Sequence, residues 1–177
     1  MENQTATDTT DFEYKDYSAI KIRSKKHDGY ITFPKRPMII AHFPMDSAVK
    51  FLELGEELDF QPDEAIISQH VIGRDFFLIC AGVVAVWREG TRLARLGQGD
   101  VFGELVIFRD HYRIASVRAE TAVRLLKFNR HVLMDFFARS EPRIFNIYTI
   151  NVIEILRRKL VLTNRRVCEL EQKLLNR

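Results

Sequence analysis

The most specific stretch of the sequence is Leu96-Gly-Gln-Gly-Asp-Val-Phe-Gly-Glu-Leu-Val-Ile-Phe-Arg-Asp-His-Tyr-Arg-Ile-Ala-Ser-Val-Arg-Ala119. Its centre, Phe102-Gly-Glu-Leu105, is followed by three apolar residues and predicts a strand end that runs into one turn of helix. A glycine at that junction lets a ligand approach the backbone, and the amides that begin a helix donate to anions. Arg113 follows nine residues after Glu104, and the small residues Ala115 and Ser116 then open a further strand. This spacing makes the stretch a candidate anion-binding site.

The residue types of this stretch suit one particular ligand chemistry. A carboxylate, a guanidinium and free amides around a short helix fit a cyclic phosphodiester on a ribose. Arg113 would fork onto phosphate oxygens, and Glu104 would accept a hydrogen bond from a 2′-hydroxyl. The alternative is an ion pair between Glu104 and Arg113 that holds a hairpin crossover and binds no ligand. From the residues alone, both interpretations stay open.

Short apolar segments broken by Gly, Asp and Pro surround this stretch. The candidate strands are ELDF (57–60), AIIS (65–68), DFFLIC (75–80), VVAVWR (83–88), TRLARL (91–96), ASVRA (115–119) and AVRLLKF (122–128). Many short strands at regular spacing predict an antiparallel sandwich or barrel.

The N-terminal 36 residues are polar and unevenly charged. Residues 1–16 are acidic and residues 21–36 are basic, and neither part shows sustained apolar periodicity. We therefore expect 1–36 to be a polar, partly disordered extension, whose basic part is either a solvated tail or a contact for a partner. The segment MIIAHF (38–43) predicts a short strand or a buried connector, and a short helix capped by Asp46 or Ser47 should follow it.

The sequence becomes helical after residue 130. A short helix is expected over 131–139, then a long one to about 175, with Ser140 as its N-cap and Pro142 in its first turn. Alternating steps of three and four residues mark a coiled-coil seam: Ile153, Leu156, Leu160, Thr163, Val167, Leu170 and Leu174. A second apolar stripe runs beside it: Phe145, Tyr148, Val152, Ile155 and Leu162. We assign the second stripe to the chain's own β domain and the seam to a second copy, which predicts a homodimer. The alternative is one wide stripe packed within a monomer.

Composition excludes several classes of protein. The chain has 177 residues, of which 46% are apolar and 29% charged, which suggests one domain plus a long helix or tail. It has no apolar run long enough to span a membrane and no recognisable signal peptide, and two distant cysteines fit a reducing, cytoplasmic compartment. The five histidines have no metal-ligand spacing, and no nucleophile or nucleotide-triphosphate motif is present. We therefore expect neither an enzyme nor a metal or cofactor site.

Residues 57–128 resemble the cyclic nucleotide-binding domain shared by the catabolite activator protein and the regulatory subunits of cAMP-dependent kinase. The resemblance is carried by Asp75-Phe-Phe-Leu-Ile, Gly82-Val-Val-Ala-Val, Gly99-Asp-Val-Phe-Gly-Glu-Leu and Arg113-Ile-Ala-Ser-Val-Arg-Ala. It implies an antiparallel β-roll or jelly-roll with a long C-terminal dimerisation helix. It also implies that the last two of these segments form the family's phosphate-binding cassette, in which Gly103 and Glu104 meet the ribose and the cassette backbone. Phe102 and Leu105 would be further ligand-binding residues. Arg113 would bind the cyclic phosphate, helped by the amides of Ile114 and Ala115.

The resemblance extends into the helix, where Lys159-Leu-Val-Leu-Thr-Asn-Arg-Arg-Val167 looks like the catabolite activator's dimer helix. Carried over, Thr163 and Asn164 would contact the base, one from each subunit. At two positions the sequence departs from the pattern of the family, with consequences for affinity and for backbone geometry. Ile114 replaces a small or hydroxyl residue, which should weaken binding by at most about tenfold. Asp63 replaces a turn glycine, a position that aspartate tolerates. A third departure is that the sequence stops where DNA-binding members begin a helix-turn-helix, so DNA binding is not expected.

We therefore expect a stand-alone sensor of cAMP, with cGMP as the alternative ligand, that signals to an unidentified protein effector. Its parts would be the extension (1–36), the β-roll (37–130) and the helical segment (131–177). A ligand-free scaffold with the same fold is the first alternative. The second is a nucleic-acid binder that uses the basic residues of the last helix.

Overall fold

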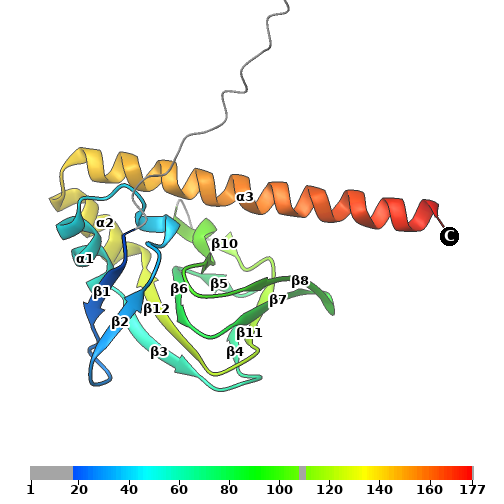
Figure 1. Ribbon diagram of the computed structural model, residues 1–177, viewed down its shortest axis with the longest axis horizontal. Coiled ribbons are helices and arrows are strands. Elements are labelled where there is room, and N and C mark those ends of the chain that lie inside the picture. The colour runs from blue at the N-terminus through cyan, green and yellow to red at the C-terminus, as the bar shows by residue number, and fades with distance from the viewer. Residues whose placement is uncertain (1–17, 108–110, 177) are drawn as a thin grey trace, which may run out of the picture.

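The computed structural model describes residues 18–107 and 111–176 as a β-roll with helices packed against one side (Figure 1). The strands are β1 (Ile20–Arg23), β2 (Tyr30–Phe33), β3 (Glu56–Phe60), β4 (Ala65–Ile67), β5 (Ile72–Gly73), β6 (Asp75–Ala81), β7 (Val84–Arg88), β8 (Thr91–Leu96), β9 (Val101–Phe102), β10 (His111–Tyr112), β11 (Ser116–Ala119) and β12 (Val123–Asn129). The helices are η1 (Met38–Ile40), α1 (Met45–Glu53), η2 (Glu104–Ile107), α2 (Arg130–Arg139) and α3 (Pro142–Leu175). None of the described helices has the length and apolar character of a bilayer span.

Two antiparallel four-stranded sheets form the roll, in the orders β4-β11-β7-β8 and β3-β12-β6-β9. This arrangement confirms the predicted fold class, and every predicted strand is present to within one residue at each end. The two-residue strands β5, β9 and β10 are too short to show a period and were not predicted as separate strands.

Strand β6 lies at the centre of the molecule and is buried on both faces. Phe76 and Leu78 pack into a core shared with the helices, whereas Phe77 and Ile79 pack between the two sheets. Successive side chains of a strand point to opposite faces, so a strand that is buried on both faces needs apolar residues at every position. The continuous apolar run of β6 meets this requirement. This double burial positions β9 and the turn after it, since β9 pairs with β6.

Residues 20–33 form a β-hairpin, so the prediction of a polar extension is wrong for this segment. Strands β1 and β2 pair with Ile20 opposite Phe33 and Ile22 opposite Ile31, and these four side chains are buried. The alternation of apolar and polar residues was present in the sequence but short and surrounded by lysines. Residues 1–17, the rest of the predicted extension, lie outside the described residues.

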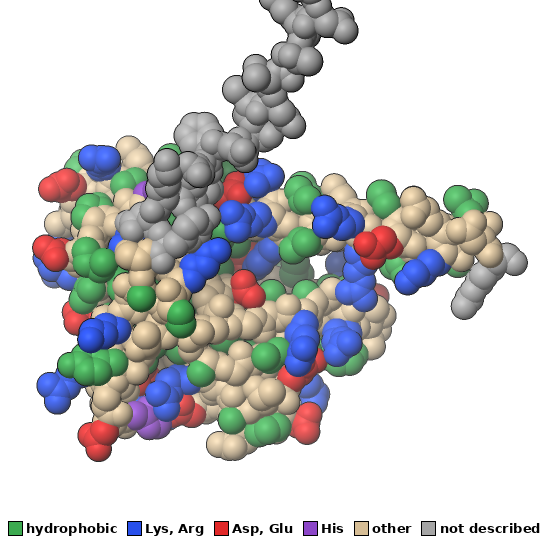
Figure 2. Space-filling model, in the orientation of Figure 1, with side chains coloured by type: hydrophobic (Ala, Val, Ile, Leu, Met, Phe, Trp, Pro, Cys, Tyr) green, Lys and Arg blue, Asp and Glu red, His purple; other side chains and the backbone are tan. Residues whose placement is uncertain are grey.

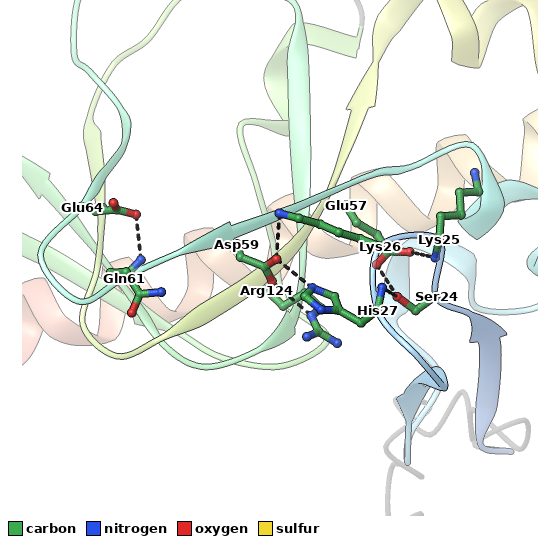
Figure 3. Close-up of polar contacts among 9 residues, drawn as sticks. All are labelled: Ser24, Lys25, Lys26, His27, Glu57, Asp59, Gln61, Glu64 and Arg124. Atoms are coloured by element: carbon green, nitrogen blue, oxygen red, sulfur yellow. Dashed lines mark hydrogen bonds and ion pairs between the residues drawn. The ribbon is translucent and has the colours of Figure 1, made fainter.

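The turn of this hairpin is bound to β3 by charged contacts (Figure 3). Asp59 accepts from Lys26 Nζ and His27 Nε2, each at 2.8 Å, and from Arg124 Nε at 3.2 Å. Ser24 Oγ donates to a carboxylate oxygen of Glu57 at 2.6 Å. Part of the basic segment is therefore used within the chain and not offered to a partner.

The Asp59 contacts predict a component of acid sensitivity. Burial alone would raise the pKa of Asp59, but the hydrogen bonds from Lys26, His27 and Arg124 outweigh it and lower the pKa from 3.8 to about 2. A carboxyl with a depressed pKa stabilises the fold above its unfolded pKa, and that contribution is lost as the pH falls from about 4 towards 2. We expect Asp59→Asn to be less stable than the parent at pH 6 and to lose less stability on acidification, measured by urea unfolding. Asp28→Asn in the same turn is the control, and equal acid losses in the parent and Asp59→Asn would contradict the prediction.

The connector and caps differ from the sequence prediction in detail. Residues 38–40 form a buried 3-10 turn, which confirms a buried connector and not a strand. The cap position of α1 is Pro44, so neither Asp46 nor Ser47 caps it. The cap position of α3 is Glu141, and Ser140 Oγ donates to Phe136 O instead.

Helix α3 packs on the roll through its first half and extends beyond the roll through its second (Figure 1). Tyr148, Val152 and Ile155 are buried, which confirms the roll-facing stripe there, whereas Phe145 and Leu162 are exposed and depart from it. Asn151 anchors the helix by donating to Ile39 O and Ala41 O. The seam residues Ile153, Leu160, Val167, Leu170 and Leu174 are exposed. The dimer stays a prediction.

Candidate ligand-binding site

The site is built around Gly103, which joins β9 to η2. Its φ of +76° lies in the left-handed region, and a Cβ there would lie 2.6 Å from Arg113 Nη1. The backbone conformation therefore favours glycine, and any Cβ at this position would also displace the guanidinium of Arg113. The predicted strand end followed by one helical turn is confirmed.

Arg113 points into this turn. Its Nη1 donates to Gly103 O at 3.3 Å, and its Nη2 donates to Asp75 O at 2.5 Å. Burial lowers the pKa of the guanidinium, and the charges of Asp75 and Glu104 partly offset that effect. Arginine nevertheless keeps its charge in proteins. The structure thus holds a half-buried cation against the backbone of the cassette.

Glu104 is 5% exposed and is bound to the long helix. Lys159 Nζ of α3 lies 2.9 Å from Glu104 Oε2 and also donates to Val101 O at 2.9 Å. Among the described residues, Glu104 pairs with Lys159 and not with Arg113, so the structural ion pair considered as the alternative is not formed. Sequence reasoning gave Lys159 no role at the site. The sequence pattern that could have indicated this role is the helical spacing, because Lys159 lies on the same face of the helix as Val152 and Ile155.

Helix α3 contacts the roll again seven residues, or about two turns, further on. Arg166 donates to Leu93 O at 2.7 Å and to Arg92 O at 3.3 Å, both on β8. The surface is hollowed between α3 and the roll, with Lys and Arg side chains near the rim (Figure 2). Thr163 lies four residues after Lys159 and three before Arg166, so it shares the face of the helix that looks onto the roll.

The predicted base-contacting residues are not part of a formed site. Thr163 and Asn164 are both exposed, and Thr163 Oγ1 donates to Lys159 O within the helix at 2.8 Å. Asn164 follows about 100° further round the helix and so leaves the roll-facing side. Contact of either residue with a base stays a prediction.

The remaining predicted residues divide between core and surface. The ring of Phe102 stacks on Phe77 with a centroid distance of 5.1 Å, so its side chain belongs to the core between the sheets. Leu105 is partly exposed, Ile114 is 63% exposed and Ala115 is half-buried. The structure therefore brings together Gly103, Glu104 and Arg113, and adds Lys159.

Comparison with known proteins identifies the class of domain. Residues 57–140 match the model of the cyclic nucleotide-binding domain family. It is similar to the human potassium/sodium hyperpolarization-activated cyclic nucleotide-gated channel 4, with 41% identity over 66 residues, which are 37% of this chain and 6% of the channel. The chain thus matches only a small part of the length of that relative.

Solved structures show the same fold. A cyclic nucleotide-binding domain from Methylobacillus flagellatus is 20% identical with a TM-score of 0.67, covering 72% of this chain and 74% of that one. The catabolite activator protein of Thermus thermophilus is 24% identical with a TM-score of 0.62, covering 78% of this chain and 63% of that one. At these identities the likeness establishes the β-roll with its following helix.

Proposed function

We propose that this protein is a cyclic nucleotide sensor, that cAMP is its preferred ligand over cGMP, and that its role is regulatory and not catalytic. The observation that carries the proposal is the guanidinium of Arg113 held against Gly103, beside the buried carboxylate of Glu104. Arginine has five N–H donors, and two of the nitrogens of Arg113 already donate to the backbone carbonyls of Gly103 and Asp75. Donors are therefore left for phosphate oxygens.

The contact between Glu104 and Lys159 supplies the coupling to α3. A ribose 2′-hydroxyl that donates to Glu104 would share or displace the ammonium of Lys159, which changes what holds the helix to the cassette. A ligand that contacts both the cassette and residues Thr163 and Asn164 of α3 stabilises the conformation in which α3 lies close to the cassette. The output is then a population shift in the position of α3, transmitted to a protein effector.

The proposed sensor is a homodimer joined along the seam of α3. A run of exposed apolar side chains at heptad spacing is typical of a coiled-coil interface. We expect a double variant, Leu160→Asp with Val167→Asp, to convert a dimer into a monomer, measured by sedimentation equilibrium. Val161→Asp adds a charge next to the seam at an exposed position and is the control. A parent that sediments as a monomer, or a double variant that stays dimeric, would refute the seam.

Contacts of the basic residues argue against a nucleic-acid binder. Arg157 and Arg158 pair with Glu154, Lys159 pairs with Glu104, and Arg166 donates to the backbone of β8. These contacts occupy much of the positive charge that would otherwise meet phosphates.

Calorimetric titration of the intact chain with cAMP and, separately, cGMP tests the proposal. We expect saturable binding of cAMP, with weaker binding of cGMP. Binding of neither nucleotide would favour the ligand-free scaffold, for which the bulky Ile114 beside the site is the main support. Tighter binding of cGMP would overturn the assignment of the ligand.

A further inference from the structure

The ion pair of Glu104 and Lys159 leaves one hydrogen-bonding group unused on each side. Glu104 lies on η2 and is 5% exposed, and its contact with Lys159 uses Oε2 alone. In the part of the chain that the structure describes, no donor bonds to Oε1, and this atom is not one of the fully enclosed polar atoms that lack a partner. Oε1 is therefore an acceptor that a small molecule can reach from the surface.

The ammonium of Lys159 has a donor to match this acceptor. An ammonium has three N–H groups. Among the described residues, two acceptors bind them, Val101 O and Glu104 Oε2, each at 2.9 Å. The side chain of Lys159 is 37% exposed, so a molecule in the site can reach the third N–H. An available donor on α3 thus lies beside an available acceptor on η2.

A hydroxyl group is the ligand chemistry that fits this combination. A hydroxyl has one donor and two acceptor lone pairs, so it can donate to Oε1 of Glu104 and accept from Nζ of Lys159 at the same time. Hydrogen bonds with one charged partner are about twice as strong as those between neutral groups. A ligand that lacks the hydroxyl would lose both of these bonds.

We propose that Lys159 is a specificity-determining residue of the ligand site, which recognises the 2′-hydroxyl of a cyclic ribonucleotide together with Glu104. The inference rests on the proposed function. It adds that the hydroxyl shares the ammonium with Glu104 and does not displace it. Because Lys159 belongs to α3 and Glu104 to η2, the hydroxyl then strengthens the contact between the helix and the cassette.

Calorimetric titration of the intact chain with cAMP and, separately, 2′-deoxy-cAMP tests the inference. In the parent we expect cAMP to bind about a hundredfold more tightly, because the deoxy compound loses two hydrogen bonds to charged groups and each contributes about tenfold. In Lys159→Met only the bond to Glu104 remains, so the preference should fall to about tenfold. Lys173→Met removes the same charge from an exposed position near the end of α3 and should keep the full preference.

The ratio of the two affinities separates recognition of the hydroxyl from a structural role. A variant that only holds α3 less firmly loses affinity for both nucleotides and keeps their ratio. An unchanged ratio in Lys159→Met would therefore overturn the proposal. Tighter binding of cAMP to this variant would also overturn it, because the ammonium would then compete with the hydroxyl. A parent that binds both nucleotides equally would overturn it and leave the proposed function intact, whereas a parent that binds neither would overturn both.

Amide hydrogen exchange of the parent gives a second measurement that needs no variant. At saturation, cAMP should protect the amides of residues 156–163 more than 2′-deoxy-cAMP does, because only cAMP bonds to Lys159 through the hydroxyl. Equal protection by the two nucleotides, or weaker protection by cAMP, would overturn the proposal.

Discussion

Replacing Arg113 with alanine is expected to weaken cAMP binding by at least about a hundredfold. In the proposed function the guanidinium neutralises the phosphate, and charge-assisted hydrogen bonds contribute about 1.5–3 kcal/mol each. Two such bonds correspond to about two factors of ten or more in affinity. The affinity of Arg113→Lys for cAMP should lie between those of the parent and Arg113→Ala, because lysine keeps the charge but cannot bind two phosphate oxygens at once as a guanidinium does.

Calorimetry of the parent and the variants with cAMP gives the comparison. Arg118→Ala is the control, since Arg118 is an exposed arginine on the adjoining strand β11. Because Arg113 also holds Gly103 O and Asp75 O, thermal unfolding of each variant should accompany the titration. A folded Arg113→Ala protein that binds cAMP as tightly as the parent would remove the basis of the proposed function.

The largest effect on stability is expected from Phe51→Ala, at about 3–5 kcal/mol. Phe51 lies on α1, is fully buried, and joins the roll to the helices at the centre of an aromatic cluster. Its ring centroid lies 5.1 Å from that of Phe128 on β12, and 5.7 Å from those of Phe43 and Tyr148. Truncation would leave a cavity bordered by elements that cannot collapse together.

Denaturant unfolding measures this loss as a lower midpoint at an unchanged slope. Met45→Ala on the same helix is the control, because Met45 is exposed and its truncation leaves no cavity. A loss below about 1 kcal/mol for Phe51→Ala would mean that the interface of α1 is not tightly packed.

The β-roll was predictable because its signals are local. The sequences of strands such as β6 and β12 are apolar or alternating runs bounded by Gly and Asp, so the positions of these strands can be predicted from a few neighbouring residues. The hairpin of β1 and β2 follows the same rule, with Ile20 and Ile22 buried between charged neighbours, but each run is only four residues long. Its burial depends on a core contributed by distant segments, which composition does not show.

The cassette was predictable for the same reason, since Gly103, Glu104 and Arg113 lie within eleven residues of each other. What could not be read from the sequence is the set of contacts made across the chain. Lys159 meets Glu104 over 55 residues, and Asn151 meets the backbone of the connector over more than 100. Such partners depend on how α3 crosses the roll, which is a result of packing and not of local pattern.

The exposed half of α3 has a consequence for amide hydrogen exchange. From Leu160 to Leu175 every side chain is exposed. Arg166 in this stretch donates hydrogen bonds to the backbone of β8. An isolated helix of about 15 residues is only marginally stable in water. Its amides should therefore exchange through local opening at low free energy unless another surface covers it, while those near Val152 open only with the core. Protection beyond Leu160 is thus a direct gauge of how much of the protein has found a partner.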